Sequence, residues 1–105
     1  MLPVQIVIKR TIGDDYPLEI SIGRTLSAAQ RSTLLTGAAV TLTVNGEPLV
    51  GTITSASAGL VQFTIPSTIY NLAAGSYTAL LRLVDSGGFT RTLADGTWRQ
   101  RAVGA

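Results

Sequence analysis

One stretch of the chain, residues 59–85, constrains the possible folds more than any other. From Val61 onward, apolar residues alternate with polar ones, which is the period-two pattern of a strand with one buried face. Pro66 has no N–H to donate and ends this ladder, and residues 67–72 then have the spacing of one short helical turn. A second alternating strand follows at residues 76–84. We therefore expect two long strands joined by a helical cap that closes one end of a core.

The same alternation recurs along the rest of the chain, separated by turn signals. Asn45-Gly46 and Asp95-Gly96 both have the composition of two-residue hairpin turns. About eight short strands with such spacing are typical of two packed antiparallel sheets. The sequence therefore predicts an all-β fold, an antiparallel immunoglobulin-like β-sandwich of about 7–8 strands that forms a single domain over residues 1–105. The predicted strands cover residues 4–9, 18–22, 40–44, 49–55, 61–65, 76–84, 89–93 and 98–103.

Residues 23–37 are the least regular segment. Ser27 is a suitable N-cap for one short helical turn over residues 28–31. A long loop that crosses between the sheets fits the pattern better, and loops of this length in a compact domain often carry function.

The composition indicates a surface that partners cover. Only 13% of the residues are charged and the net charge is +2, whereas hydrophobic residues make up 46%. With so few charges to keep it dispersed, such a domain is expected to bury part of its surface against other proteins. The alternative is an ordinary sandwich with a Thr-rich outer face. The N-terminus lacks the charged start of a signal peptide, and no apolar run reaches membrane-spanning length.

The residues that usually carry catalysis or bind metals are scarce. The chain has no histidine and no cysteine, so a Ser-His-Asp triad and thiolate ligands are both excluded. A calcium site at the acidic residues is disfavoured, because it would need about six oxygens from a rigid loop. A glycosidase-like pair is disfavoured because its carboxyls would have to share a cleft. We therefore expect no enzyme, no metal and no cofactor. The acids concerned are Asp14, Asp15, Glu19, Glu47, Asp85 and Asp95.

Arginines and tyrosines are the candidates for protein contacts. Arginine offers a planar fork of donors to acidic groups, and tyrosine is enriched at interfaces. If the last two strands pair through a hairpin at Asp95-Gly96, three of the arginines share one face. The alternatives are a solvated edge strand for these arginines and packing at the core rim for the tyrosines. Nucleic-acid binding is disfavoured, because no aromatic platform lies between the arginines. The candidates are Tyr16, Arg24, Arg31, Tyr70, Arg91, Arg99 and Arg101.

The order of these segments resembles a known family over essentially the whole chain. It is similar to the immunoglobulin-like N-terminal domain of phage baseplate upper proteins, a module of tailed-phage structural proteins. The segments that carry the resemblance are Ile12-Gly13-Asp14-Asp15, Leu34-Leu35-Thr36-Gly37-Ala38, Val40-Thr41-Leu42-Thr43-Val44, Gly59-Leu60-Val61-Gln62-Phe63, the cap at residues 66–72, Ala74-Gly75-Ser76-Tyr77 and Asp95-Gly96-Thr97-Trp98.

The resemblance implies a structural role in a virion, with no catalytic residues to transfer. Because the chain ends at Ala105, it implies a small tail, baseplate or fibre adaptor, or a capsid cement or decoration protein, rather than a full baseplate subunit. Its partners would be other phage structural proteins, bound in several copies within a symmetric particle assembled in the host cytoplasm, with no nucleic acid or membrane. The alternative is a carbohydrate- or receptor-binding module in which Tyr16 and Tyr70 supply the aromatic contacts.

Overall fold

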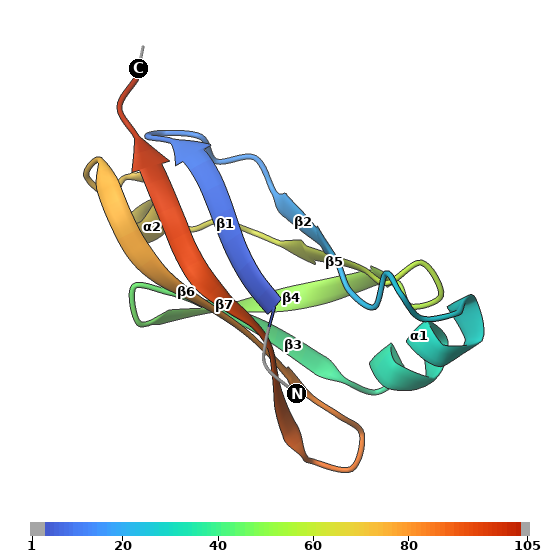
Figure 1. The fold of residues 1–105 in the computed structure, drawn as a ribbon. Helices are drawn as coiled ribbons and strands as arrows, with labels where there is room; N and C mark the ends of the chain where they lie inside the picture. The colour runs from blue at the N-terminus through green and yellow to red at the C-terminus, as the bar shows by residue number, and fades with distance from the viewer. Residues whose placement is uncertain (1–3, 104–105) are drawn as a thin grey trace.

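The computed structural model describes residues 4–103, which form seven strands and two short helices (Figure 1). No helix in this part of the chain is long and apolar enough to cross a membrane. The predicted all-β class is confirmed. The strands are β1 (Val4–Thr11), β2 (Leu18–Ser21), β3 (Ala39–Val44), β4 (Glu47–Ser55), β5 (Leu60–Phe63), β6 (Gly75–Val84) and β7 (Thr90–Arg101), and the helices are α1 (Ala28–Leu35) and α2 (Ser67–Tyr70).

The strands form one hydrogen-bonded sheet in the order β1-β7-β6-β3-β4-β5-β2. Every neighbouring pair is antiparallel except β1 and β7, which run parallel. The sheet curls strongly, so its two halves enclose the core as the layers of a sandwich would (Figure 1). Its edge strands, β1 and β2, face each other across a groove of about 420 Å³. The predicted β-sandwich-like fold is therefore confirmed, with two differences in detail: the layers belong to one curled sheet, and one of its strand pairs is parallel.

The core lies on the concave side of this sheet. Trp98 and Phe63 are its largest fully buried side chains. The indole Nε1 of Trp98 donates a hydrogen bond to Oε1 of Gln100 at 2.9 Å, and Nε2 of Gln100 donates to the carbonyl oxygen of Tyr70 at 2.9 Å. This chain of bonds ties β7 to α2, whose Ile69 is buried in the core. The predicted helical cap is confirmed, but only the strand after it, β6, is long, because β5 has four residues.

The two predicted hairpin turns have different outcomes. Asn45-Gly46 does join β3 to β4, with φ of 51° and 81° at the two residues, as such a turn requires. The hairpin predicted at Asp95-Gly96 is wrong, because β7 continues through it from Thr90 to Arg101. A Cβ at Gly96 would lie 1.8 Å from the carbonyl oxygen of Ile6. Glycine at this position therefore allows the backbone of β1 to approach β7 closely, and it does not form a turn.

A second helix replaces most of the loop predicted at residues 23–37. Ser27 caps α1: its Oγ accepts a hydrogen bond from the backbone N–H of Gln30 at 3.2 Å, and the Gln30 side chain accepts one from the N–H of Ser27 at 2.9 Å. Only Leu35 of this helix is buried. Most of α1 is therefore exposed, which explains why its apolar pattern is weak in the sequence.

Candidate functional site

The register of β1, β7 and β6 places Lys9, Arg99 and Ser76 in one row across the sheet. Lys9 lies opposite Arg99 in the parallel pair, and Ser76 lies opposite Arg99 in the antiparallel pair. Side chains of residues directly opposite each other point to the same face. Arg101 follows Arg99 by two residues, so it lies on that face as well. All four belong to the convex surface, because the intervening Arg10 and Gln100 are buried.

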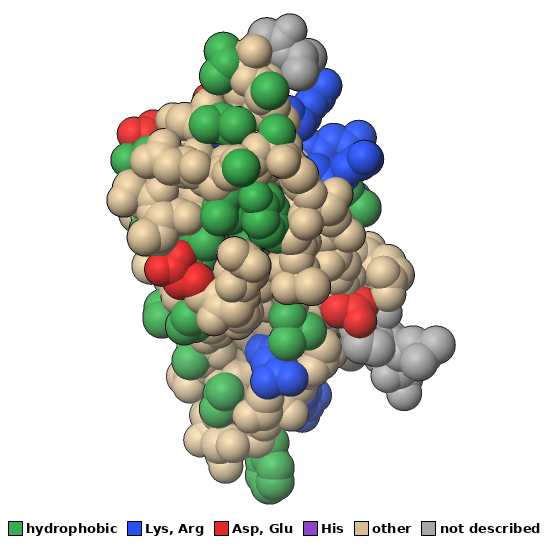
Figure 2. All heavy atoms as spheres, turned by 90° about the vertical axis from the view of Figure 1, so that its left-hand side faces the viewer, with side chains coloured by type: hydrophobic (Ala, Val, Ile, Leu, Met, Phe, Trp, Pro, Cys, Tyr) green, Lys and Arg blue, Asp and Glu red, His purple; other side chains and the backbone are tan. Residues whose placement is uncertain are grey.

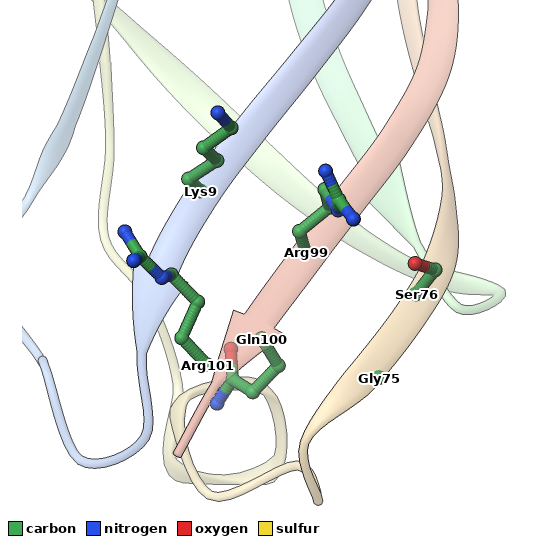
Figure 3. Close-up of a pocket in the computed structure, with 6 residues that line it drawn as sticks. All are labelled: Lys9, Gly75, Ser76, Arg99, Gln100 and Arg101. Carbon is green, nitrogen blue, oxygen red and sulfur yellow. The ribbon is translucent and has the colours of Figure 1, made fainter. Parts of the chain in front are cut away.

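These residues surround a shallow pocket, called the basic pocket below. Its volume is about 350 Å³, and Figure 3 shows Lys9 and Arg99 extending the same way from neighbouring strands. In the view of Figure 2, Lys and Arg side chains gather beside the C-terminal end of the molecule, where β7 ends. The side chains of Lys9, Arg99 and Arg101 are exposed. The pocket is lined by Lys9, Gly75, Ser76, Arg99, Gln100 and Arg101.

No acidic side chain forms an ion pair with the basic pocket within residues 4–103, although Glu19 lines the groove between β1 and β2 together with Lys9. The ion pair in this part of the chain joins Arg91 to Asp85 at 3.6 Å. The nearest acid along the same face of β7 is Asp95, about 13 Å from Arg99 along the strand. Its Oδ1 already accepts a hydrogen bond of 2.7 Å from Nε2 of Gln5. Two like charges directly opposite each other destabilise a sheet. A bound anion would therefore reduce the repulsion between Lys9 and Arg99.

The other predicted arginines do not join this pocket. Arg91 lies near the opposite end of β7, about 27 Å along the strand from Arg99. Arg31 bonds within the protein: its Nε donates to the Ser57 carbonyl at 2.6 Å, and its Nη1 donates to that of Leu26 at 2.6 Å. Arg24 is exposed in the segment before α1. Arg91 also lies opposite the buried Leu83, whereas Arg99 lies opposite the exposed Ser76, because a register shift in the β6–β7 pair lies between them. Of the three arginines predicted to share one face, Arg99 and Arg101 do so and Arg91 does not.

The two predicted tyrosines differ in their surroundings. Tyr16 is 56% exposed, and one face of its ring covers the guanidinium of Arg10. Tyr70 is half-buried and packs against the core. Its carbonyl oxygen accepts hydrogen bonds from Gln100 and from the backbone N–H of Gly13. The backbone of Tyr70 therefore has a structural role, and the side chain of Tyr16 remains available to solvent.

Three of the acidic side chains, those of Glu47, Asp85 and Asp95, make separate local contacts. Thr68 donates to Glu47 at 2.7 Å, and Asp85 accepts the backbone N–H groups of Gly87 and Phe89. No group of three potential metal ligands occurs among residues 4–103.

Lys9 and Ser76 were not singled out from the sequence. The sequence signal for these two residues was the alternation of polar and apolar residues in β1 and β6. This alternation indicates which face of a strand is exposed, but not which strand lies beside it.

The comparisons with known proteins identify a shared fold. No family model and no curated protein matches the chain. A similar solved structure is the crystal structure of CopC from Methylosinus trichosporium OB3b, with a TM-score of 0.50 and 13% sequence identity, covering 93% of this chain and 88% of CopC. At this identity the likeness shows the fold alone.

This finding overturns the predicted function. The resemblance implied a tailed-phage virion structural protein, whereas a solved structure with a similar fold is that of CopC. The prediction of a phage structural role is therefore corrected. The segments that carried the resemblance are short turns, short strands and one helical turn. They are encoded by local requirements such as positive φ, which unrelated β folds share.

Proposed function

We propose that this protein is a non-catalytic binding domain that holds an acidic segment of a partner protein in the basic pocket. The observation that carries the proposal is the row of Lys9 and Arg99, extended by Arg101, which forms no ion pair within the described residues. Arginine forks bind carboxylates with two parallel hydrogen bonds. The curled sheet supplies a rigid support, because β7 is paired on both sides.

A binding role is also supported by the chemistry of the rest of the surface. The chain has no histidine or cysteine, and Glu47, Asp85 and Asp95 each bond to a different local donor. General acid–base catalysis needs titratable groups that converge on one reacting atom. A protein partner is favoured over nucleic acid, because the net charge is only +2 and no aromatic side chain lines the pocket.

The test uses labelled poly-L-glutamate as a probe for an acidic polypeptide. The wild-type chain is expected to bind it at low salt and to release it at high salt. Arg99→Gln should weaken binding by roughly three- to tenfold, whereas Arg24→Gln, the matched control before α1, should change it less than about twofold. Equal effects of the two substitutions would overturn the proposal. Tighter binding of single-stranded DNA than of poly-L-glutamate would overturn it as well.

A further inference from the structure

The geometry of the basic pocket specifies its ligand more closely. Neighbouring strands are about 4.8 Å apart, so the row of Lys9, Arg99 and Ser76 spans about 10 Å. Arg101 lies about 6.6 Å farther along β7. Three positive charges and a hydroxyl donor thus lie on one face within about two strand spacings of one another.

The shape of the pocket leaves room for such a group. Gly75 lines it, and a Cβ at this position would meet no atom within 4 Å. The buried Gln100 also lines the pocket, but its side-chain oxygen and nitrogen already bond to Trp98 and Tyr70. The available donors are therefore the charged ends of Lys9, Arg99 and Arg101 and the hydroxyl of Ser76.

Charge and donor count then distinguish between anions. A carboxylate is planar and carries one charge, so one arginine fork is sufficient to saturate it. A phosphate or sulfate group has oxygens that point in several directions, and a phosphate monoester carries close to two charges at neutral pH. Building on the proposed function, we infer that the basic pocket binds one tetrahedral oxyanion group, a phosphate or sulfate ester, carried by the partner. In this arrangement Lys9 on β1 and Arg99 on β7 bind the anion from neighbouring strands. Arg101 binds it from the end of β7, and Ser76 from β6.

The experiment is a titration of the ¹⁵N-labelled chain, followed by NMR, with inorganic phosphate, sulfate and acetate at matched ionic strength. We expect phosphate and sulfate to shift the amides around Lys9, Ser76, Arg99 and Arg101, and to bind roughly five- to tenfold more tightly than acetate. Lys9→Gln and Arg99→Gln should each remove this preference. Arg82→Gln, an exposed arginine on β6, is the matched control and should preserve it. Phenyl phosphate and phenyl sulfate then show which ester is preferred.

The outcomes separate this inference from the proposed function. If poly-L-glutamate binding depends on Arg99 but phosphate and sulfate bind no better than acetate, the domain is a carboxylate binder and the inference is wrong. If the tetrahedral anions bind without any dependence on Lys9 or Arg99, they bind elsewhere and the inference is again wrong. If phosphate or sulfate is preferred and poly-L-glutamate does not bind, the inference holds and the acidic segment of the proposed function is replaced by an esterified one.

Discussion

The guanidinium carbon of Arg10 lies 3.7 Å from the centre of the Tyr16 ring, although Arg10 is 4% exposed and Tyr16 belongs to a surface loop. Nη2 of Arg10 also donates hydrogen bonds to the carbonyl oxygens of Asp14 and Tyr16. No acid pairs with Arg10 among residues 4–103, and its Nε has no hydrogen-bond partner there. The loop between β1 and β2 thus takes the place of a counter-ion, because carbonyl dipoles and a π face surround the charge.

A double-mutant cycle measures this relationship. Arg10→Met should lower the free energy of unfolding by about 1–3 kcal/mol, because two hydrogen bonds from a charged group are lost while most of the apolar volume stays. Tyr16→Leu should lower it by about 1 kcal/mol. Urea denaturation of both single variants and of the double variant should give a coupling energy of about 0.5–2 kcal/mol. Strict additivity would mean that the ring contributes nothing to holding Arg10.

Gly96 tests the continuous course of β7. Gly96→Ala should lower the free energy of unfolding by about 3 kcal/mol or more, because the new Cβ would meet the backbone of Ile6 and separate β1 from β7. Gly87→Ala is the control, since its nearest new contact is a side-chain oxygen at 3.3 Å. It should cost less than about 1 kcal/mol. Thermal unfolding followed by circular dichroism distinguishes the two, and a mild effect at Gly96 would indicate that β1 does not pass so close.

The capping box of α1 makes a smaller contribution. Ser27→Ala removes the acceptor of the Gln30 N–H and should lower the free energy of unfolding by about 1 kcal/mol. Ser57→Ala is a suitable comparison, because Ser57 is exposed and its contact with Arg31 uses the backbone carbonyl. Urea midpoints of the two variants provide the measurement. If both variants lose the same stability, the cap does not hold the helix.

The basic pocket should carry a cost in stability. Lys9→Glu replaces a like charge opposite Arg99 with an opposite one, so it should raise the free energy of unfolding by about 0.2–1 kcal/mol at low salt. The gain should shrink at high salt, because exposed charges are screened. Urea denaturation at two salt concentrations checks both points. A loss of stability at low salt would show that Lys9 and Arg99 do not repel each other in the folded state.

Local patterns predicted much of the fold. The alternation of Val40, Leu42 and Val44 identifies β3 and its buried face, because a period of two is the geometry of a single strand. Pro66 and the residues after it identify α2 in the same way. Helix α1 was largely missed, since only Leu35 of that helix is fully buried and its other residues are half-buried or exposed.

The candidate site was predicted only in part. Arg99 and Arg101 were recognised as exposed arginines on one strand face, but Lys9 was not joined to them. Its place opposite Arg99 comes from the parallel pairing of β1 with β7, which connects the two ends of the chain. The glycine that allows this pairing, Gly96, has the same local sequence signal as a hairpin turn. Only the presence of β1 beside Gly96 shows that this glycine allows strand pairing and does not form a turn.

The sequence by itself determined most strand segments and the core-facing side chains within them, because both follow from residues close together in the chain; the continuous course of β7 is the exception. The tertiary structure alone decided which strands are neighbours and in what register. That choice depends on how the curled sheet fills its core around Trp98 and Phe63, and on where backbones are able to approach. The basic pocket is a consequence of that choice, since its charges come from strands at opposite ends of the chain.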